Sequence, residues 1–90
     1  MDHEESYQIV FTRAARRGMK GLPREVLRRV DAAILGLAHD PRPPGAEKLT
    51  GYDFYRIRVG DYRIIYQIED DRLVILVIRV GHRRDIYREL

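Results

Sequence analysis

The 90-residue chain contains no cysteine, a single serine, and no apolar stretch of the about 20 residues that a membrane-spanning helix needs. Without cysteine, it can form neither a disulfide bond nor a thiolate metal site. The serine, Ser6, lies in an acidic N-terminal segment that lacks the basic start and apolar core of a signal peptide. We therefore expect no serine nucleophile and no export signal, and we place the protein in the cytoplasm.

Two further classes of site are not expected. The three histidines, His3, His39 and His82, are scattered along the chain and have few ligand-type neighbours, so they do not indicate a metal site. No glycine-rich phosphate loop precedes a predicted helix, which argues against that kind of nucleotide binding. We therefore expect neither a metal nor a cofactor.

Ninety residues are enough for one domain with a small core. We expect a flexible tail over residues 1–6 and a single domain over residues 7–90. The net charge of +3 and the isoelectric point near 9.5 permit an acidic partner. Positive charge is concentrated between residues 13 and 29, where Glu25 is the only acid among these basic residues: Arg13, Arg16, Arg17, Lys20, Arg24, Arg28 and Arg29.

The first half of the chain predicts one strand and two helices. Loose alternation of apolar and polar residues indicates a strand over Tyr7–Phe11, and Thr12 is a suitable N-cap for a short helix that ends near Lys20. Pro23 suits the first turn of a second helix, which Asp40 and Pro41 end. Its apolar face has helical spacing and comprises Val26, Leu27, Val30, Ile34 and Leu37.

The second half changes to a period of two. Tyr55–Val59 and Tyr62–Ile68 predict a hairpin around Gly60-Asp61, and Asp70-Asp71 turns the chain into an apolar strand over Leu73–Val80. A last helical turn follows. The predicted fold is α+β, with element order β-α-α-β-β-β and a helical hairpin packed on one face of a mainly antiparallel sheet.

A two-residue hairpin turn determines which side chains share a face. It directs Tyr55, Ile57 and their partners towards the helices, and it places Arg58 opposite Arg63 on the other face, with Arg56 alongside. Like charges opposed across two strands destabilise a hairpin. Because no acid is expected on this face, we interpret it as an anion site, although a solvated arginine surface is the simpler alternative.

If Asp70-Asp71 is also a two-residue turn, Arg63 pairs with Ile78 on the last strand. The chain then leaves that strand at the same end of the sheet, with His82, Arg83, Arg84 and Tyr87. Arginines bind phosphates through paired donors, and a tyrosine offers a stacking surface for a base. Metal-free RNA cleavage also requires proton transfer, which arginine performs poorly because of its high pKa, so Tyr87 or His82 would carry it.

Three motifs on these elements resemble the RelE toxins of bacterial and archaeal toxin–antitoxin pairs, and the resemblance covers nearly the whole chain from Tyr7. They are KLTG at residues 48–51, YRIRVGDYRIIY at 55–66 and VGHRRDIY at 80–87, preceded by the similar segment FTRAARRGMKGLP at 11–23. The resemblance implies a ribosome-dependent endoribonuclease that cuts mRNA in the A site by 2′-hydroxyl attack, without a metal. It also implies an antitoxin partner, through which alone operator DNA would be bound.

The same resemblance implies roles for individual residues. Tyr87 matches a stacking platform and candidate base, while Arg58, Arg63 and Arg83 match phosphate clamps. Arg56 would serve as an orienting charge, and His82 is a candidate proton carrier. Well-studied members have lysines at the positions of Arg56 and Arg58, which leaves the base open. Contacts with RNA or the ribosome are expected from Arg13, Arg16, Arg17, Lys20, Arg28, Lys48 and Arg84.

Two other functions remain open. The chain could resemble the ParE toxins, which inhibit DNA gyrase without cutting RNA. It could instead be a degenerate toxin that binds its antitoxin but no longer cleaves, which the arginines at positions 56 and 58 would allow. The arginine set together with Tyr87 favours the nuclease.

Overall fold

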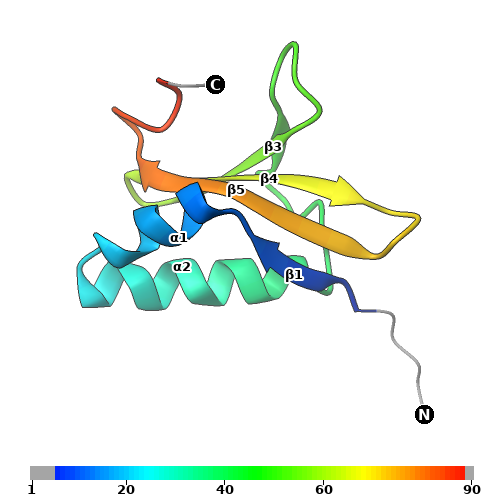
Figure 1. The fold of residues 1–90 in the computed structure, drawn as a ribbon, viewed down its shortest axis with the longest axis horizontal. Helices are drawn as coiled ribbons and strands as arrows, with labels where there is room; N and C mark the ends of the chain where they lie inside the picture. The colour runs from blue at the N-terminus through cyan, green and yellow to red at the C-terminus, as the bar shows by residue number, and fades with distance from the viewer. Residues whose placement is uncertain (1–5, 89–90) are drawn as a thin grey trace.

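Two helices cover one face of a five-stranded sheet in the computed structural model, which describes residues 6–88 (Figure 1). The strand order is β1-β5-β4-β3-β2, with β1 parallel to β5 and the other neighbours antiparallel. The predicted tail lies outside the described residues except for Ser6, which is exposed. In chain order the elements are β1 (Gln8–Phe11), α1 (Arg13–Lys20), α2 (Arg24–Leu37), β2 (Glu47–Lys48), β3 (Tyr55–Val59), β4 (Tyr62–Glu69) and β5 (Val74–His82).

The predicted fold class is confirmed, with one addition. The short strand β2 pairs with the start of β3, where Glu47 lies opposite Arg56 and Lys48 opposite Tyr55. This strand was not predicted from the sequence, because two residues are too few to show a period. β2 ends the sheet on the side away from β1.

Thr12 connects α1 to the centre of the sheet. Its hydroxyl accepts a hydrogen bond from the backbone N–H of Ala15 (3.0 Å), as an N-cap should, and donates to the carbonyl of Ile78 in β5 (2.7 Å). Its own N–H donates to the carbonyl of Val77 (3.0 Å). The predicted N-cap is therefore confirmed, and it also sets where α1 crosses β5.

The hairpin register is confirmed. In β3 and β4, Ile57 pairs with Ile64 and Arg58 with Arg63, as the two-residue turn requires. Gly60 in this turn has φ of +60°, a conformation that favours glycine.

The predicted register between β4 and β5 is wrong. Arg63 pairs with Gly81, and not with Ile78. The turn after β4 occupies residues 70–73, four rather than two, and Leu73 adopts a positive φ of 54°. A β-bulge then shifts the pairing by one more residue, because Ile65 pairs with Arg79 while Tyr66 pairs with Val77.

The core lies between the helices and the sheet. Val30, Ile34 and Leu37 of α2 pack there with residues of β4 and β5, of which Tyr66 is the largest and is fully buried. The hydroxyl of Tyr66 donates to the carbonyl of Pro41 (2.7 Å), which satisfies it in the interior. This bond also attaches the loop after α2 to the sheet.

Tyr66 should make stability fall in alkaline solution. Burial raises the pKa of Tyr66 to about 12, above the ordinary value of about 10. The fold therefore favours the protonated phenol, and this contribution is complete below pH ~10 and is lost between pH ~10 and ~12, at up to about 1.4 kcal/mol per pH unit. When the free energy of unfolding is measured by urea titration over this pH range, Tyr66→Phe is expected to lack this part of its decrease with pH. At pH 7 it should be less stable by about 1 kcal/mol, because the Pro41 carbonyl loses its donor.

Tyr52→Phe is the matched control, because Tyr52 is exposed whereas Tyr66 is fully buried. It should follow the wild-type pH profile. Parallel profiles for wild type and Tyr66→Phe between pH 10 and 12 would contradict the prediction.

Candidate functional site

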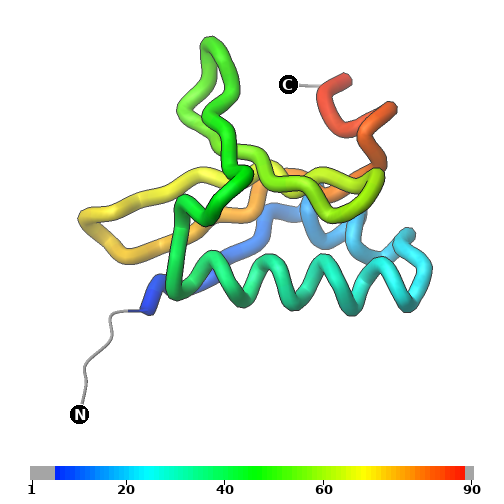
Figure 2. The backbone as a smooth tube through the Cα atoms, turned by 180° about the vertical axis from the view of Figure 1, so that it is seen from behind, coloured from blue at the N-terminus to red at the C-terminus, as the bar shows by residue number. Residues whose placement is uncertain are grey.

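The sheet face opposite the helices carries two rows of side chains that contain four arginines. The first row crosses β2, β3, β4 and β5 and comprises Glu47, Arg56, Ile65 and Arg79. The second row comprises Arg58, Arg63 and Gly81. The loop between β2 and β3 and the segment after β5 rise on this side of the sheet in both views (Figures 1 and 2).

Arg56 is buried and paired with an acid. It is 9% exposed, and its Nη2 donates to the carboxylate of Glu47 in β2. Its Nε is also buried and has no hydrogen-bond partner among the described residues. The expectation of a face without acids is therefore wrong, because the unpredicted strand β2 brings Glu47 onto it. Much of the Arg56 charge is balanced within the protein.

Arg58 and Arg63 form the opposed pair that the sequence predicted. Arg58 is exposed, whereas Arg63 is half-buried and folds back over the hairpin turn. Its Nη1 donates to the carbonyls of Gly60 (3.0 Å) and Tyr62 (3.0 Å). These bonds hold the guanidinium at the turn, and within residues 6–88 its Nε and Nη2 have no hydrogen bond. Those two nitrogens are therefore the donors that Arg63 can offer to a ligand.

Arg79 belongs to this face but was missed from the sequence. The predicted register placed it on the helix side, whereas the bulge aligns it with Ile65. The available signal was its position as the only charged residue in the apolar run from 73 to 80. Two-fold alternation could not identify its face, because a bulge inverts the alternation.

The segment after β5 is anchored at the same end of the sheet. The backbone N–H of Arg83 donates to the carbonyl of Asp61 (2.8 Å), and its Nε lies 3.8 Å from the Asp61 carboxylate. Ile86 is 2% exposed and packs over Gly81, where a Cβ would lie 3.4 Å from its Cδ1. This anchoring places Tyr87, which is exposed, beside a hollow of about 290 Å³ that Leu49, Thr50 and Tyr52 also line.

His82 reaches this end of the sheet but belongs to the other face. It pairs with Tyr62, and the two rings meet edge to face with centroids 5.4 Å apart. Its Nδ1 accepts a hydrogen bond from the backbone N–H of Arg84 (3.2 Å). His82 therefore shapes the turn that leads to Tyr87, and the structure does not bring it onto the face of Arg58 and Arg63.

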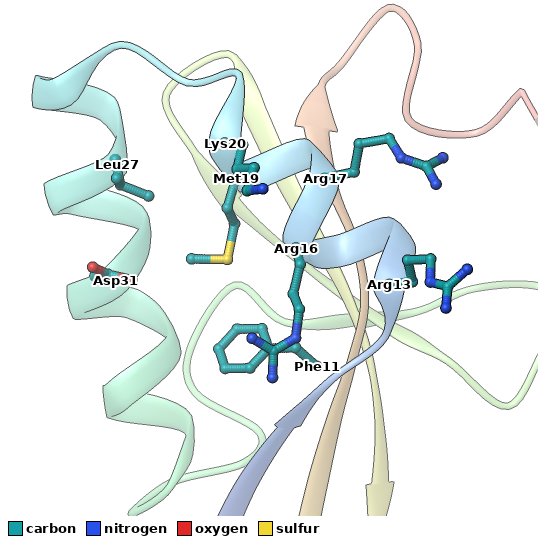
Figure 3. A pocket seen from close by; sticks show the side chains of 8 residues that line it. All are labelled: Phe11, Arg13, Arg16, Arg17, Met19, Lys20, Leu27 and Asp31. Atoms are coloured by element: carbon teal, nitrogen blue, oxygen red, sulfur yellow. The ribbon is translucent and has the colours of Figure 1, made fainter.

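The basic residues of α1 form a separate surface on the helix side. Arg16 lies over the ring of Phe11 with its Cζ 5.6 Å from the ring centroid (Figure 3). Met19 and Leu27 line the hollow between α1 and α2, and Arg13 and Arg17 point away from Leu27 (Figure 3). Arg28 on α2, Lys48 on β2 and Arg84 after β5 are exposed at other places. The structure therefore does not gather the predicted RNA- or ribosome-binding residues into one patch.

The geometry suits an anion with an attached aromatic or planar group. Exposed Arg58 and half-buried Arg63 offer guanidinium donors, and Tyr87 lies on the segment after β5, which rises on the same side of the sheet. Within residues 6–88, no three histidine, aspartate or glutamate side chains are grouped as metal ligands. In the same part of the chain, no helix has the length and apolarity to span a bilayer.

Comparisons with known proteins agree with this fold. Residues 9–87 match the family model of the ParE toxin of type II toxin–antitoxin systems. Toxin RelG of Mycobacterium tuberculosis is 36% identical over 86 residues, which cover 91% of this chain and 97% of that toxin. The mRNA interferase toxin RelE of Escherichia coli K12 is 30% identical over 89 residues, with 93% of each chain covered.

A solved structure gives the same result in three dimensions. The toxin–antitoxin complex RelBE2 of M. tuberculosis contains a chain with a TM-score of 0.80 and 31% identity, and the match covers 94% of this chain and 100% of that one. Sequence and fold therefore agree over nearly the whole length. The chain belongs to the RelE/ParE superfamily of type II toxin–antitoxin toxins, and the named toxins that it resembles are of the RelE family.

Proposed function

We propose that this toxin is a ribosome-dependent endoribonuclease that cuts mRNA in the A site. The observation that carries the proposal is the opposed pair Arg58 and Arg63, on the same face as Tyr87 and away from the helices. A relative at 30% identity that is named an mRNA interferase supports it. We assign the cytoplasm as the place of action, where mRNA and ribosomes are present.

The chemistry is an in-line displacement within the RNA. The 2′-oxygen loses its proton and attacks the neighbouring phosphorus, the bond from phosphorus to the 5′-oxygen breaks, and that oxygen takes a proton. Arg58, Arg63 and Arg83 neutralise the negative charge that builds on the phosphate. A guanidinium stabilises this charge well because it remains protonated, and for the same reason it cannot serve as the base.

Proton transfer is therefore assigned to Tyr87. Its side chain is exposed at the hollow beside Leu49, Thr50 and Tyr52, while His82 lies on the other face with its Nδ1 engaged. The substitution of lysines by Arg56 and Arg58 removes two groups that could lose a proton. Arg56, which is buried against Glu47, is left with the role of an orienting charge.

We also propose a cognate antitoxin as the regulating partner. The structural relative from M. tuberculosis was crystallised as a toxin–antitoxin complex. A partly disordered antitoxin that folds on binding could cover the arginine rows, and operator DNA would be bound through the antitoxin.

A paired assay tests the proposed function. The purified toxin is added to ribosomes translating a defined mRNA, and cuts are mapped by primer extension; in parallel, it is added to a gyrase supercoiling reaction. We expect cuts at A-site codons and unchanged supercoiling. Inhibited supercoiling without cuts would support a ParE-like toxin, in line with the matching family model. No effect in either assay would indicate a toxin that has lost activity.

A further inference from the structure

Tyr52 lines the same hollow as Tyr87 but belongs to a different segment, the loop between β2 and β3. Among residues 6–88, the two exposed tyrosine or phenylalanine side chains are Tyr52, 42% exposed, and Tyr87, 41% exposed, and both line the hollow. They come from segments far apart in the sequence, the loop between β2 and β3 and the segment after β5, which rise from the same side of the sheet (Figure 2). Exposed aromatic rings at one small hollow are typical of a stacking site.

The ring of Tyr52 is held in place before any ligand arrives. It stacks on Phe54, with centroids 5.7 Å apart and an interplanar angle of 12°. The loop is closed by hydrogen bonds from the N–H of Tyr52 to the carbonyl of Leu49 (3.2 Å) and from the N–H of Leu49 to the carbonyl of Phe54 (2.9 Å). Gly51 has φ of +83°, which favours glycine at this turn. A pre-organised ring loses little conformational entropy when a ligand stacks on it.

The loop is also attached to the sheet that carries the arginines. The side-chain amide of Gln67 in β4 donates to the Asp53 carboxylate (3.4 Å). The aromatic hollow and the guanidinium groups of Arg58 and Arg63 therefore lie on the same side of the sheet, which suits a ligand that combines a flat group with negative charge. A nucleobase with its phosphates has this chemistry, whereas an apolar side chain of a protein partner has no need of the cations.

We propose that Tyr52 and Tyr87 form a two-sided slot for one unpaired nucleobase of the RNA, with Tyr52 as a binding and specificity residue. The inference rests on the proposed function for the identity of the ligand. It adds the second wall of the slot, and it predicts that base recognition depends on the loop between β2 and β3 as well as on the C-terminal segment.

A binding assay without ribosomes tests the slot. The probe is a single-stranded hexanucleotide RNA with 2-aminopurine at one position and 2′-O-methyl groups throughout, which block cleavage, and the matched probe has an abasic site at that position. Stacking should quench 2-aminopurine fluorescence in the wild-type complex. We expect Tyr52→Ala to weaken binding of the 2-aminopurine RNA about tenfold. Tyr52→Phe, which keeps the ring, should bind within about twofold of wild type.

The abasic RNA separates stacking from other effects. Its binding should be weaker than that of the 2-aminopurine RNA and should be unchanged by Tyr52→Ala. Leu35→Ala is the control, because Leu35 is 65% exposed on α2 and lies outside the hollow. A midpoint of thermal unfolding equal to that of wild type would show that each variant is folded.

Three results would overturn the slot. They are wild-type binding by Tyr52→Ala, equal weakening with both RNAs, or no quenching in the wild-type complex, which would leave the hollow to a protein partner. Because this assay needs neither ribosomes nor cleavage, its outcome is independent of the cleavage assay. Cuts on the ribosome with an unaffected Tyr52→Ala would reject only the slot, whereas quenching without cuts would reject only the nuclease.

Discussion

Replacing Gly18 with alanine is expected to lower the free energy of unfolding by about 3 kcal/mol or more, a large part of the stability of a small domain. Gly18 lies in α1 where the helix crosses β5, and a Cβ there would lie 2.0 Å from the carbonyl oxygen of Val80. No change of side-chain rotamer can relieve this contact, because the oxygen belongs to the main chain. The helix would have to move away from β5, to which Thr12 attaches it. Urea unfolding followed by circular dichroism measures the loss.

Gly36→Ala is the matched control. Gly36 also lies in a helix, and a Cβ at this position meets no atom within 4 Å. Alanine is the better helix former, so this variant should be more stable than wild type by up to about 1 kcal/mol. An unfolding midpoint for Gly18→Ala equal to that of wild type would show that α1 and β5 do not approach as closely as described.

Replacing Arg63 with alanine is expected to slow mRNA cleavage on the ribosome at least about 100-fold, as loss of a transition-state donor does elsewhere. Within residues 6–88, Arg63 has two guanidinium nitrogens without a hydrogen bond beside exposed Arg58, and it is already held by the carbonyls of Gly60 and Tyr62. Arg63→Lys should be intermediate, because lysine keeps the charge but not the paired donors. Single-turnover cleavage at saturating toxin separates the chemical step from binding.

Arg72→Ala is the control for a lost arginine. Arg72 is exposed at the turn after β4, far along the strand from Arg63, and pairs with Glu69. Its removal should leave cleavage unchanged. Tyr87→Phe is a companion variant that keeps the ring and loses the hydroxyl, so it should slow cleavage strongly if the hydroxyl transfers the proton. A folded Arg63→Ala protein that cuts at the wild-type rate would remove Arg63 from the proposed mechanism.

The pairing of residues between β3 and β4 could be derived from the sequence. A two-residue turn leaves one pairing, and the apolar residues must face the helices, so the positions of Arg58 and Arg63 followed. The N-cap at Thr12 and the apolar face of α2 were also local signals. These features depend on residues only a few positions apart.

The pairing of β5 could not be derived in this way. The bulge at Ile78 is stabilised by the hydroxyl of Thr12, which is 66 residues away in the sequence. Nothing near Ile78 indicates that its carbonyl will be satisfied from α1. The missed bulge had a functional consequence, because it moved Arg79 onto the face of the candidate site.

By itself, the sequence determined the order of the elements other than the two-residue strand β2, the family and the cationic hairpin, because periodicity, turn chemistry and motif spacing are local properties. Only the tertiary structure decided which of these charges remain available. It buried Arg56 against Glu47, placed His82 on the other face, and brought Tyr52 and Tyr87 to one hollow. Burial and pairing depend on segments that are distant in the chain, so the composition of the site became visible only once the sheet was assembled.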